Sequence, residues 1–195
     1  MKFSVSETTD LIRARRTIYP KDYTDRVVHR EMVERVLTNA TYAPTHGMTQ
    51  PWRFTVFSGA ARQELSNFLG TEYRRITPPE KFLQRKYDNT TQRALQSSVV
   101  IALGMIHDPE GKIGLEDDLL AMACAVQNMQ LTCTAYGLGS FWGTGKVLTG
   151  EPMRDFLQLG PNGRSLGLLY MGYPAIEWPK GYRKPLDQVV SWKEA

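Results

Sequence analysis

NATYAPTHGMTQPWRFTVFSG, residues 39–59, joins the clearest helical pattern of the chain to a clear strand pattern. The helix is expected to end at Pro44, because a residue that precedes a proline is disfavoured in helical geometry. After Pro51, large apolar and polar residues alternate as in a half-buried strand. Between the prolines stand four residues that a plain connection does not need: Thr45, His46, Gly47 and Gln50. The stretch predicts a helix, a ligand-holding loop and a strand in direct succession.

Patterns on either side of this stretch complete an α+β chain. Helical patterns cover residues 6–17, 29–44, 60–75, 115–139 and 151–160, and a polar helix on the surface or over a site is expected within 76–98. In the first helix, Leu11 and Ile12 are expected to face inward. Apolar runs at 99–105 and 164–174 predict two buried strands. No repeat or linker divides the chain, so a single domain over residues 1–195 is expected.

The segment from Leu119 to Leu138 is apolar on nearly all sides and predicts a central buried helix that Gly137 and Gly139 end. One chain of this size offers little to cover such a helix completely. We therefore expect a homodimer in which a second copy covers Met122, Val126, Met129 and Leu131.

Composition excludes several classes of protein. The 195 residues carry a net charge of only +4 without a basic run, which argues against nucleic-acid binding. No apolar run approaches the roughly 20 residues of a membrane span, and the first residues lack the apolar core of a secretory signal. Cys124 and Cys133 lie too far apart along one helix to form a disulfide. Buried, reduced thiols and a cytoplasmic location are expected.

Motifs for nucleophilic or metal chemistry are missing from the sequence. There is no G-x-S-x-G motif, and His29, His46 and His107 have no second ligand at metal-binding spacing. Three short motifs suit phosphate or ring binding: RARRT at 13–17, GTG at 143–145 and YRKP at 182–185. Taken singly, each also has a plain structural explanation, as a cationic helix end, a turn and a solubilising tail.

Five motifs together resemble the nitroreductase family in order and spacing, and their form is similar to its compact branch of NAD(P)H nitroreductases. They are RARRTIY (13–19), APTHGMTQPWRFTVF (43–57), GLGSFWGTG (137–145), LLYMGYP (168–174) and YRKPLDQVV (182–190). The resemblance implies a nitroreductase-like α+β fold: a small mixed sheet surrounded by helices, in a homodimer with two FMN sites at the interface. It also implies NAD(P)H as the electron donor.

The resemblance implies a role for each matching residue. Arg15, Arg16 and Thr17 would hold the phosphate, the ribityl chain and the pyrimidine edge of FMN, and Arg183 would bind the phosphate. Tyr42, His46 and Gln50 would contact the flavin across the interface. Trp142, Gly143 and Thr144 would lie along its ring or phosphate side. Hydride moves between nicotinamide and flavin, so no catalytic side chain is assigned.

The sequence departs from the family at Met48, where many members carry asparagine, and His46 is expected to replace part of that contact. Residues 78–96 match least, in a region that shapes the family's substrate pocket. The function implied is NAD(P)H-dependent, ping-pong reduction of nitroaromatics, quinones or similar electron-poor acceptors. Two alternatives stay open: a non-catalytic flavin carrier, and a flavin enzyme of the same fold that performs dehalogenation, enone reduction or flavin breakdown.

Overall fold

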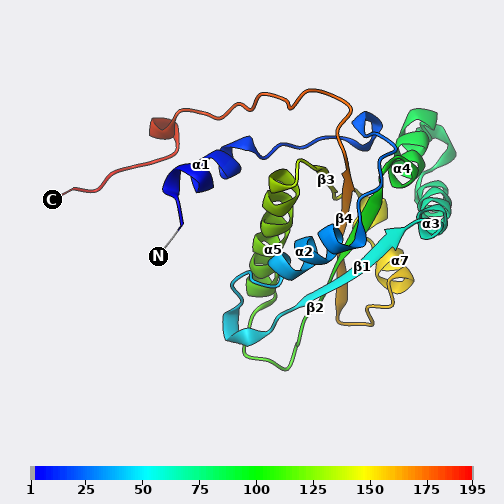
Figure 1. Ribbon diagram of the computed structural model, residues 1–195. Helices are drawn as coiled ribbons and strands as arrows, with labels where there is room; N and C mark the ends of the chain where they lie inside the picture. Colours follow the sequence, from blue (N-terminus) through cyan, green and yellow to red (C-terminus); the bar gives the residue numbers. More distant parts are fainter. Residues whose placement is uncertain (1–2, 195) are drawn as a thin grey trace.

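A four-stranded sheet separates two helical layers in the computed structural model, which describes residues 3–194 (Figure 1). The strands are β1 (Trp52–Ser58), β2 (Val99–Ile106), β3 (Gly139–Gly143) and β4 (Gly163–Gly172), in the order β1-β2-β4-β3. All three ladders are antiparallel. The expected mixed sheet is therefore corrected: within residues 3–194, the one parallel pairing is the isolated bridge between Thr17 and Ser140.

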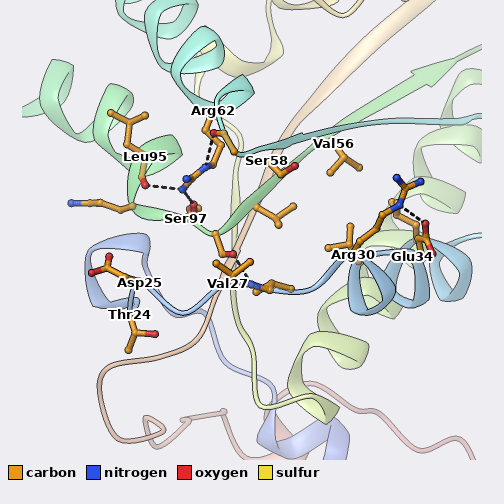
Figure 2. Close-up of a pocket in the computed structure, with 17 residues that line it drawn as sticks. Thr24, Asp25, Val27, Arg30, Glu34, Val56, Ser58, Arg62, Leu95 and Ser97 are labelled. Carbon is orange, nitrogen blue, oxygen red and sulfur yellow. Dashed lines mark hydrogen bonds and ion pairs between the residues drawn. The ribbon is translucent and has the colours of Figure 1, made fainter.

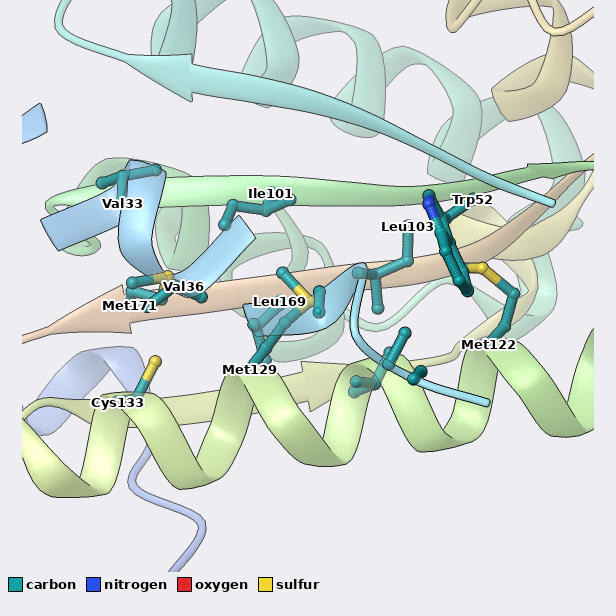
Figure 3. Packing of buried hydrophobic residues seen from close by; sticks show 14 of the residues in the cluster. Val33, Val36, Trp52, Ile101, Leu103, Met122, Met129, Cys133, Leu169 and Met171 are labelled. Carbon is teal, nitrogen blue, oxygen red and sulfur yellow. The ribbon is translucent and has the colours of Figure 1, made fainter. Parts of the chain in front are cut away.

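The first helical layer consists of α2 (Arg30–Ala40) and α5 (Leu115–Ala135), which pack on one face of the sheet. Figure 3 shows Met122, Met129 and Cys133 of α5 pointing at Ile101, Leu103 and Leu169 of the sheet. The α5 helix ends in a Schellman arrangement, in which Gly137 has a φ of 67° and the Leu138 amide bonds to the Cys133 carbonyl at 2.8 Å. The predicted stop at Gly137 is confirmed.

The second layer covers the opposite face with α3 (Ala61–Ile76), α4 (Gln84–Gln96), α6 (Lys146–Thr149) and α7 (Glu151–Phe156). The expected polar helix within 76–98 exists as α4. It packs on α3, where Tyr73, Phe82 and Tyr87 form an aromatic cluster. This places α4 on the far side of the sheet from α5 and from the loop between the two prolines.

The N-terminal helix α1 (Val5–Ala14) and the segment after residue 174 extend away from the sheet side by side (Figure 1). The inward orientation expected for Ile12 is wrong in the single chain, because its side chain is exposed, whereas Leu11 is half-buried and faces α5 across a pocket. Short 3₁₀ turns complete the structure: η1 (Pro20–Asp22), η2 (His46–Met48), η3 (Pro79–Lys81) and η4 (Leu186–Gln188).

The α5 helix is covered on one side only. Met122, Val126 and Met129, which we expected to face a second copy, are buried in their own chain against the sheet. The outer side instead presents Leu120, which is 65% exposed, and the thiol-bearing Cys124. Burial of both cysteines is therefore wrong for Cys124. None of the helices in residues 3–194 has the length and hydropathy needed to cross a bilayer.

The sequence patterns predicted the long elements but did not reveal the two short ones, β3 and α6. β3 is five residues long, begins and ends with glycine, and is held by its pairing to β4. Such a strand depends on tertiary contacts rather than on its own periodicity.

Candidate flavin-binding site

Two cations of the predicted site, Arg15 and Arg183, lie together without a carboxylate partner. Partial burial, the charge of Arg183 and the charge of Arg16, in that order, lower the pKa of Arg15. Among the ion pairs of residues 3–194, none includes any of these three arginines. Two guanidinium groups repel each other at close range, and an anion bound between them offsets this repulsion. The cluster therefore suits a phosphate.

Arg16 has a different task from Arg15. Its Nε donates to the Pro179 carbonyl at 2.9 Å, and one terminal nitrogen donates to the carbonyls of Arg13 and Arg15 at 2.5 and 2.7 Å. A Cβ at Gly181 would overlap the Arg16 guanidinium, so the two segments are in close contact. Arg16 therefore binds backbone carbonyls and joins the N-terminal segment to the tail.

A second contact strengthens this junction. The indole Nε1 of Trp178 donates to the Ala14 carbonyl at 2.6 Å. Together, Trp178 and Arg16 hold residues 178–181 against residues 14–16, and Arg183 follows two residues later. The sequence did not single out Trp178, because nothing in the linear pattern links it to residue 14.

Thr17 leads from the arginine cluster into the sheet. It forms the parallel bridge with Ser140, and the Ile18 amide donates to the Ser140 carbonyl at 3.1 Å. Ser140 belongs to β3, whose end carries the predicted residues Trp142 and Gly143. The structure therefore connects two of the predicted groups through one bridge.

Trp142, Gly143 and Thr144 lie beside a pocket of about 380 Å³ between β3, β4 and α5. The Trp142 indole donates to the Leu166 carbonyl at 2.9 Å, so its N–H is already satisfied within the chain. Gly143 is buried and Thr144 is exposed. The face of the Trp142 indole and the exposed Thr144 remain available to contact a ligand ring.

The loop from Pro44 to Pro51 has an unusual backbone. Gly47, Met48 and Gln50 all adopt left-handed conformations, with φ values of 56°, 57° and 44°. For non-glycine residues this geometry costs about 1–3 kcal/mol each, and such strain clusters at ligand-binding sites. The loop is anchored to the first turn of α5, where Thr49 donates to Asp118 at 2.7 Å.

The three predicted flavin contacts from this region remain exposed in the single chain. His46 places its Nδ1 3.3 Å from the Asp117 carboxylate, and Gln50 carries an exposed side chain. Tyr42 is 82% exposed beside a pocket between α1, α2 and α5. These side chains are available to a neighbouring molecule.

The arginine cluster and the loop lie at opposite ends of α5. The cluster adjoins Ser140, just beyond the C-terminal end of the helix, whereas the loop is bound to Asp117 and Asp118 at its first turn. From Asp118 to Tyr136 the helical rise is about 27 Å, which exceeds the length of one FMN molecule. One chain therefore does not bring all ten predicted residues to one ligand.

A pocket of about 760 Å³, shown in Figure 2, lies elsewhere, beside the free edge of β1. None of the ten predicted residues lines it. Its arginines are already engaged: Arg62 donates to the backbone carbonyls of Gly59, Leu95 and Ser97, and Arg30 pairs with Glu34. This pocket therefore offers no unpaired cation for a phosphate.

The sequence analysis singled out Thr45 but missed the other polar residues that support the loop, Thr49, His107 and Asp118. Asp118 is only 1% exposed, and His107 places its Nδ1 2.8 Å from one carboxylate oxygen. In the sequence, Asp118 looks like one of three acidic residues that favour a helix N-terminus. Burial is what distinguishes Asp118 from the other two acidic residues, and burial depends on the fold.

Comparison with known proteins gives a consistent result. The sequence model of the nitroreductase family matches residues 12–173. A Bacillus subtilis protein named "Putative NAD(P)H nitroreductase YfhC" is 30% identical over 168 residues, which are 85% of this chain and 83% of that protein.

Solved structures show the same fold. A nitroreductase-like family protein from Bacillus cereus superposes with a TM-score of 0.81 at 24% identity, over 100% of both chains. A Desulfovibrio desulfuricans nitroreductase crystallised with FMN gives a TM-score of 0.72 at 24% identity, over 96% of both chains. With the family match over most of its length, the chain belongs to the nitroreductase family.

Proposed function

We propose that the protein is an FMN-dependent oxidoreductase that uses NAD(P)H to reduce nitroaromatics, quinones or similar electron-poor acceptors. The observation that carries the proposal is the cluster of Arg15 and Arg183 without an anionic partner, in which partial burial and then repulsion from Arg183 and Arg16 lower the pKa of Arg15. A phosphate between two guanidinium groups would relieve that repulsion. The names of the relatives agree, since one is named "Putative NAD(P)H nitroreductase YfhC" and another was crystallised in complex with FMN.

The residues divide the work of binding. Arg15 and Arg183 would hold the phosphate, Thr17 would lie beside the ribityl chain, and Arg16 would keep the tail in place. The indole face of Trp142, the backbone at Gly143 and the exposed Thr144 would border the ring. FMN, when bound, supplies the hydride-accepting and hydride-donating chemistry, so donor and acceptor can use one site in turn by a ping-pong route.

The second half of the site would come from another copy of the chain. Leu120 and Cys124 leave an apolar strip on the outer side of α5, and α1 and the tail reach away from their own sheet. Exposed apolar surface of this kind marks an interface. A homodimer would cover the strip and bring the loop of one chain, with Tyr42, His46 and Gln50, to the arginine cluster of the other.

The test begins with purified protein and its absorption spectrum. We expect a yellow protein whose flavin is FMN, bleached anaerobically by NADH or NADPH and recoloured by a nitroaromatic or quinone. A flavin that neither nucleotide reduces would contradict the reductase activity and leave the carrier role. A colourless protein that takes up no added FMN would overturn the proposal as a whole.

A further inference from the structure

A chain of hydrogen bonds runs from the loop backbone into the protein interior and ends at Asp118. Gln50 N–H lies 3.2 Å from Thr45 Oγ1, which lies 3.0 Å from Thr49 Oγ1. Thr49 Oγ1 lies 2.7 Å from Asp118 Oδ1, and His107 Nδ1 lies 2.8 Å from Asp118 Oδ2. Both carboxylate oxygens of this buried residue are therefore occupied.

The chemistry of these groups sets the direction of the chain. A carboxylate only accepts, so the Thr49 hydroxyl must donate to Asp118 and can accept only from Thr45. Thr45 then donates to Thr49 at 3.0 Å, in preference to the His46 carbonyl at 3.4 Å, and accepts the Gln50 amide. Each donor points toward Asp118, and bonds to a charged acceptor are stronger than neutral ones. The carboxylate thus orients three successive groups.

The end of this chain is the strained part of the loop. Gln50 has a φ of 44°, a conformation that persists only where the surroundings enforce it. Its amide is fixed by Thr45, and its carbonyl accepts from Arg53 at 3.3 Å. With the backbone held on both sides, the Cα–Cβ bond of Gln50 keeps one direction, and its exposed side chain remains available to a ligand.

We propose that Asp118 is a positioning residue for the flavin site, and that it acts through Thr49 and Thr45 on Gln50. His107 completes the arrangement by occupying the other carboxylate oxygen. The proposal rests on the proposed FMN function and assigns a role to four residues that do not touch the ligand. Without the chain, the left-handed backbone at Gln50 would relax and the loop would no longer fit the flavin.

The central variant is Thr49→Val, which keeps the shape of the side chain and removes the hydroxyl. We expect its FMN affinity to fall about ten- to a hundredfold, as for loss of a hydrogen bond to a charged group. Thr49→Ser restores the hydroxyl and is expected to stay within about threefold of wild type. Thr90→Val is the matched control, because its hydroxyl bonds to a backbone carbonyl within α4.

A second measurement separates positioning from general destabilisation. Hydrogen exchange of the Gln50 amide in the FMN-free protein should accelerate in Thr49→Val and remain slow in Thr49→Ser and Thr90→Val. If Thr49→Val does not fold, Thr45→Val interrupts the chain one step farther from the buried carboxylate and carries the same expectations.

The outcomes distinguish the two proposals. Wild-type FMN affinity in Thr49→Val, with or without faster exchange at Gln50, would overturn the role of Asp118 and leave the proposed function standing. A fall in FMN affinity that Thr49→Ser does not restore would also overturn it. Wild-type protein that binds no FMN would overturn both.

Discussion

The arginine cluster and the loop from Pro44 to Pro51 satisfy their polar groups in opposite ways. Arg15 and Arg183 stand close together without an anionic partner, and partial burial followed by repulsion from Arg183 and Arg16 lowers the pKa of Arg15. The loop directs its hydroxyls and the Gln50 amide inward to one buried carboxylate, which offsets its left-handed backbone. The first region is incomplete without a ligand, whereas the second is already organised and offers only exposed side chains.

This difference indicates how each region contributes to binding. A cluster of unpaired cations contributes affinity through charge-assisted hydrogen bonds, so substitutions there should be costly for FMN. A preorganised loop contributes shape, and its substitutions should act through geometry. Because the two regions lie at opposite ends of α5, we propose that two chains form each flavin site.

The largest effect is expected from Arg15→Ala combined with Arg183→Ala. Each substitution removes a bond worth about 1.5–3 kcal/mol, so FMN affinity should fall by about two to four decades if the losses add. Riboflavin, which lacks the phosphate, should lose far less affinity in the same titration. Arg85→Ala, on the exposed side of α4, serves as the control. An equal loss for riboflavin and FMN would contradict phosphate binding by the cluster.

Next in size is the effect of a charge on the outer strip of α5. Leu120→Glu should prevent a second copy from packing there, because burial of an unpaired carboxylate is strongly unfavourable. Light scattering should then give 22.1 kDa, the mass of one chain, instead of twice that value. FMN should be lost together with the dimer. Leu83→Glu on the opposite helical layer should leave the mass at that of wild type.

The two cysteines report which side of α5 is covered. Burial raises the pKa of Cys133 to about 12, so this thiol should not react with a thiol reagent at pH 8 while the protein is folded. Cys124 should be protected in the dimer and react rapidly in Leu120→Glu. Adding Cys124→Ser to the Leu120→Glu variant should abolish the rapid reaction and so assign it to Cys124. If two thiols per chain reacted rapidly in the folded wild-type protein, the packing described for α5 would be contradicted.

The raised pKa of Cys133 also gives a pH dependence of stability. The unfolded thiol ionises near its ordinary pKa of about 8.5, whereas the folded thiol keeps its proton until about pH 12. The contribution of this burial to stability is therefore complete below about pH 8.5 and falls as the pH rises toward 12. Cys133→Ala should flatten this part of the profile in urea titrations from pH 8 to 11.

The smallest effect is expected from Met48→Gly. Glycine tolerates the φ of 57° at this position, and the Met48 side chain is 73% exposed, so little packing is lost. Relief of strain, offset by the entropy of glycine, should raise the free energy of unfolding by up to about 1 kcal/mol. Gln158→Gly, at a φ of 55° after α7, should give a similar gain without affecting FMN. A loss above about 1 kcal/mol in Met48→Gly would show that the side chain contributes packing.

Much of the fold was predictable from periodicity. The apolar stripe of α2, the buried strand β2 and the glycine stop of α5 follow from local patterns that the structure confirms. β3 was not predictable, since its glycine-bounded residues depend on pairing with β4. The face of α5 that meets the sheet was also assigned wrongly. A helix with apolar residues all round gives no sequence signal for which side its own sheet covers.

The candidate site divides in the same way. The motifs proposed Arg15, Arg183 and the loop as candidates, because ligand-binding residue types in a set order can be recognised in a sequence. They could not distinguish Arg15 from Arg16, since the difference lies in contacts with Pro179 and Gly181, more than 160 residues away. Asp118 and His107 were missed because their importance comes from burial and from a hydrogen-bond chain that exists only in the folded protein.

The most direct test of two chains per flavin is a mixed dimer. One tagged chain carries Arg15→Ala and Arg183→Ala, and a differently tagged chain carries Thr49→Val and Gln50→Ala, so that each homodimer should bind FMN weakly. In the purified mixed dimer, one site combines all four substitutions and the other combines two intact halves. The account predicts that one tightly bound FMN per mixed dimer returns. No recovery of tight FMN binding in a stable mixed dimer would show that both halves of each site come from the same chain and would contradict the account.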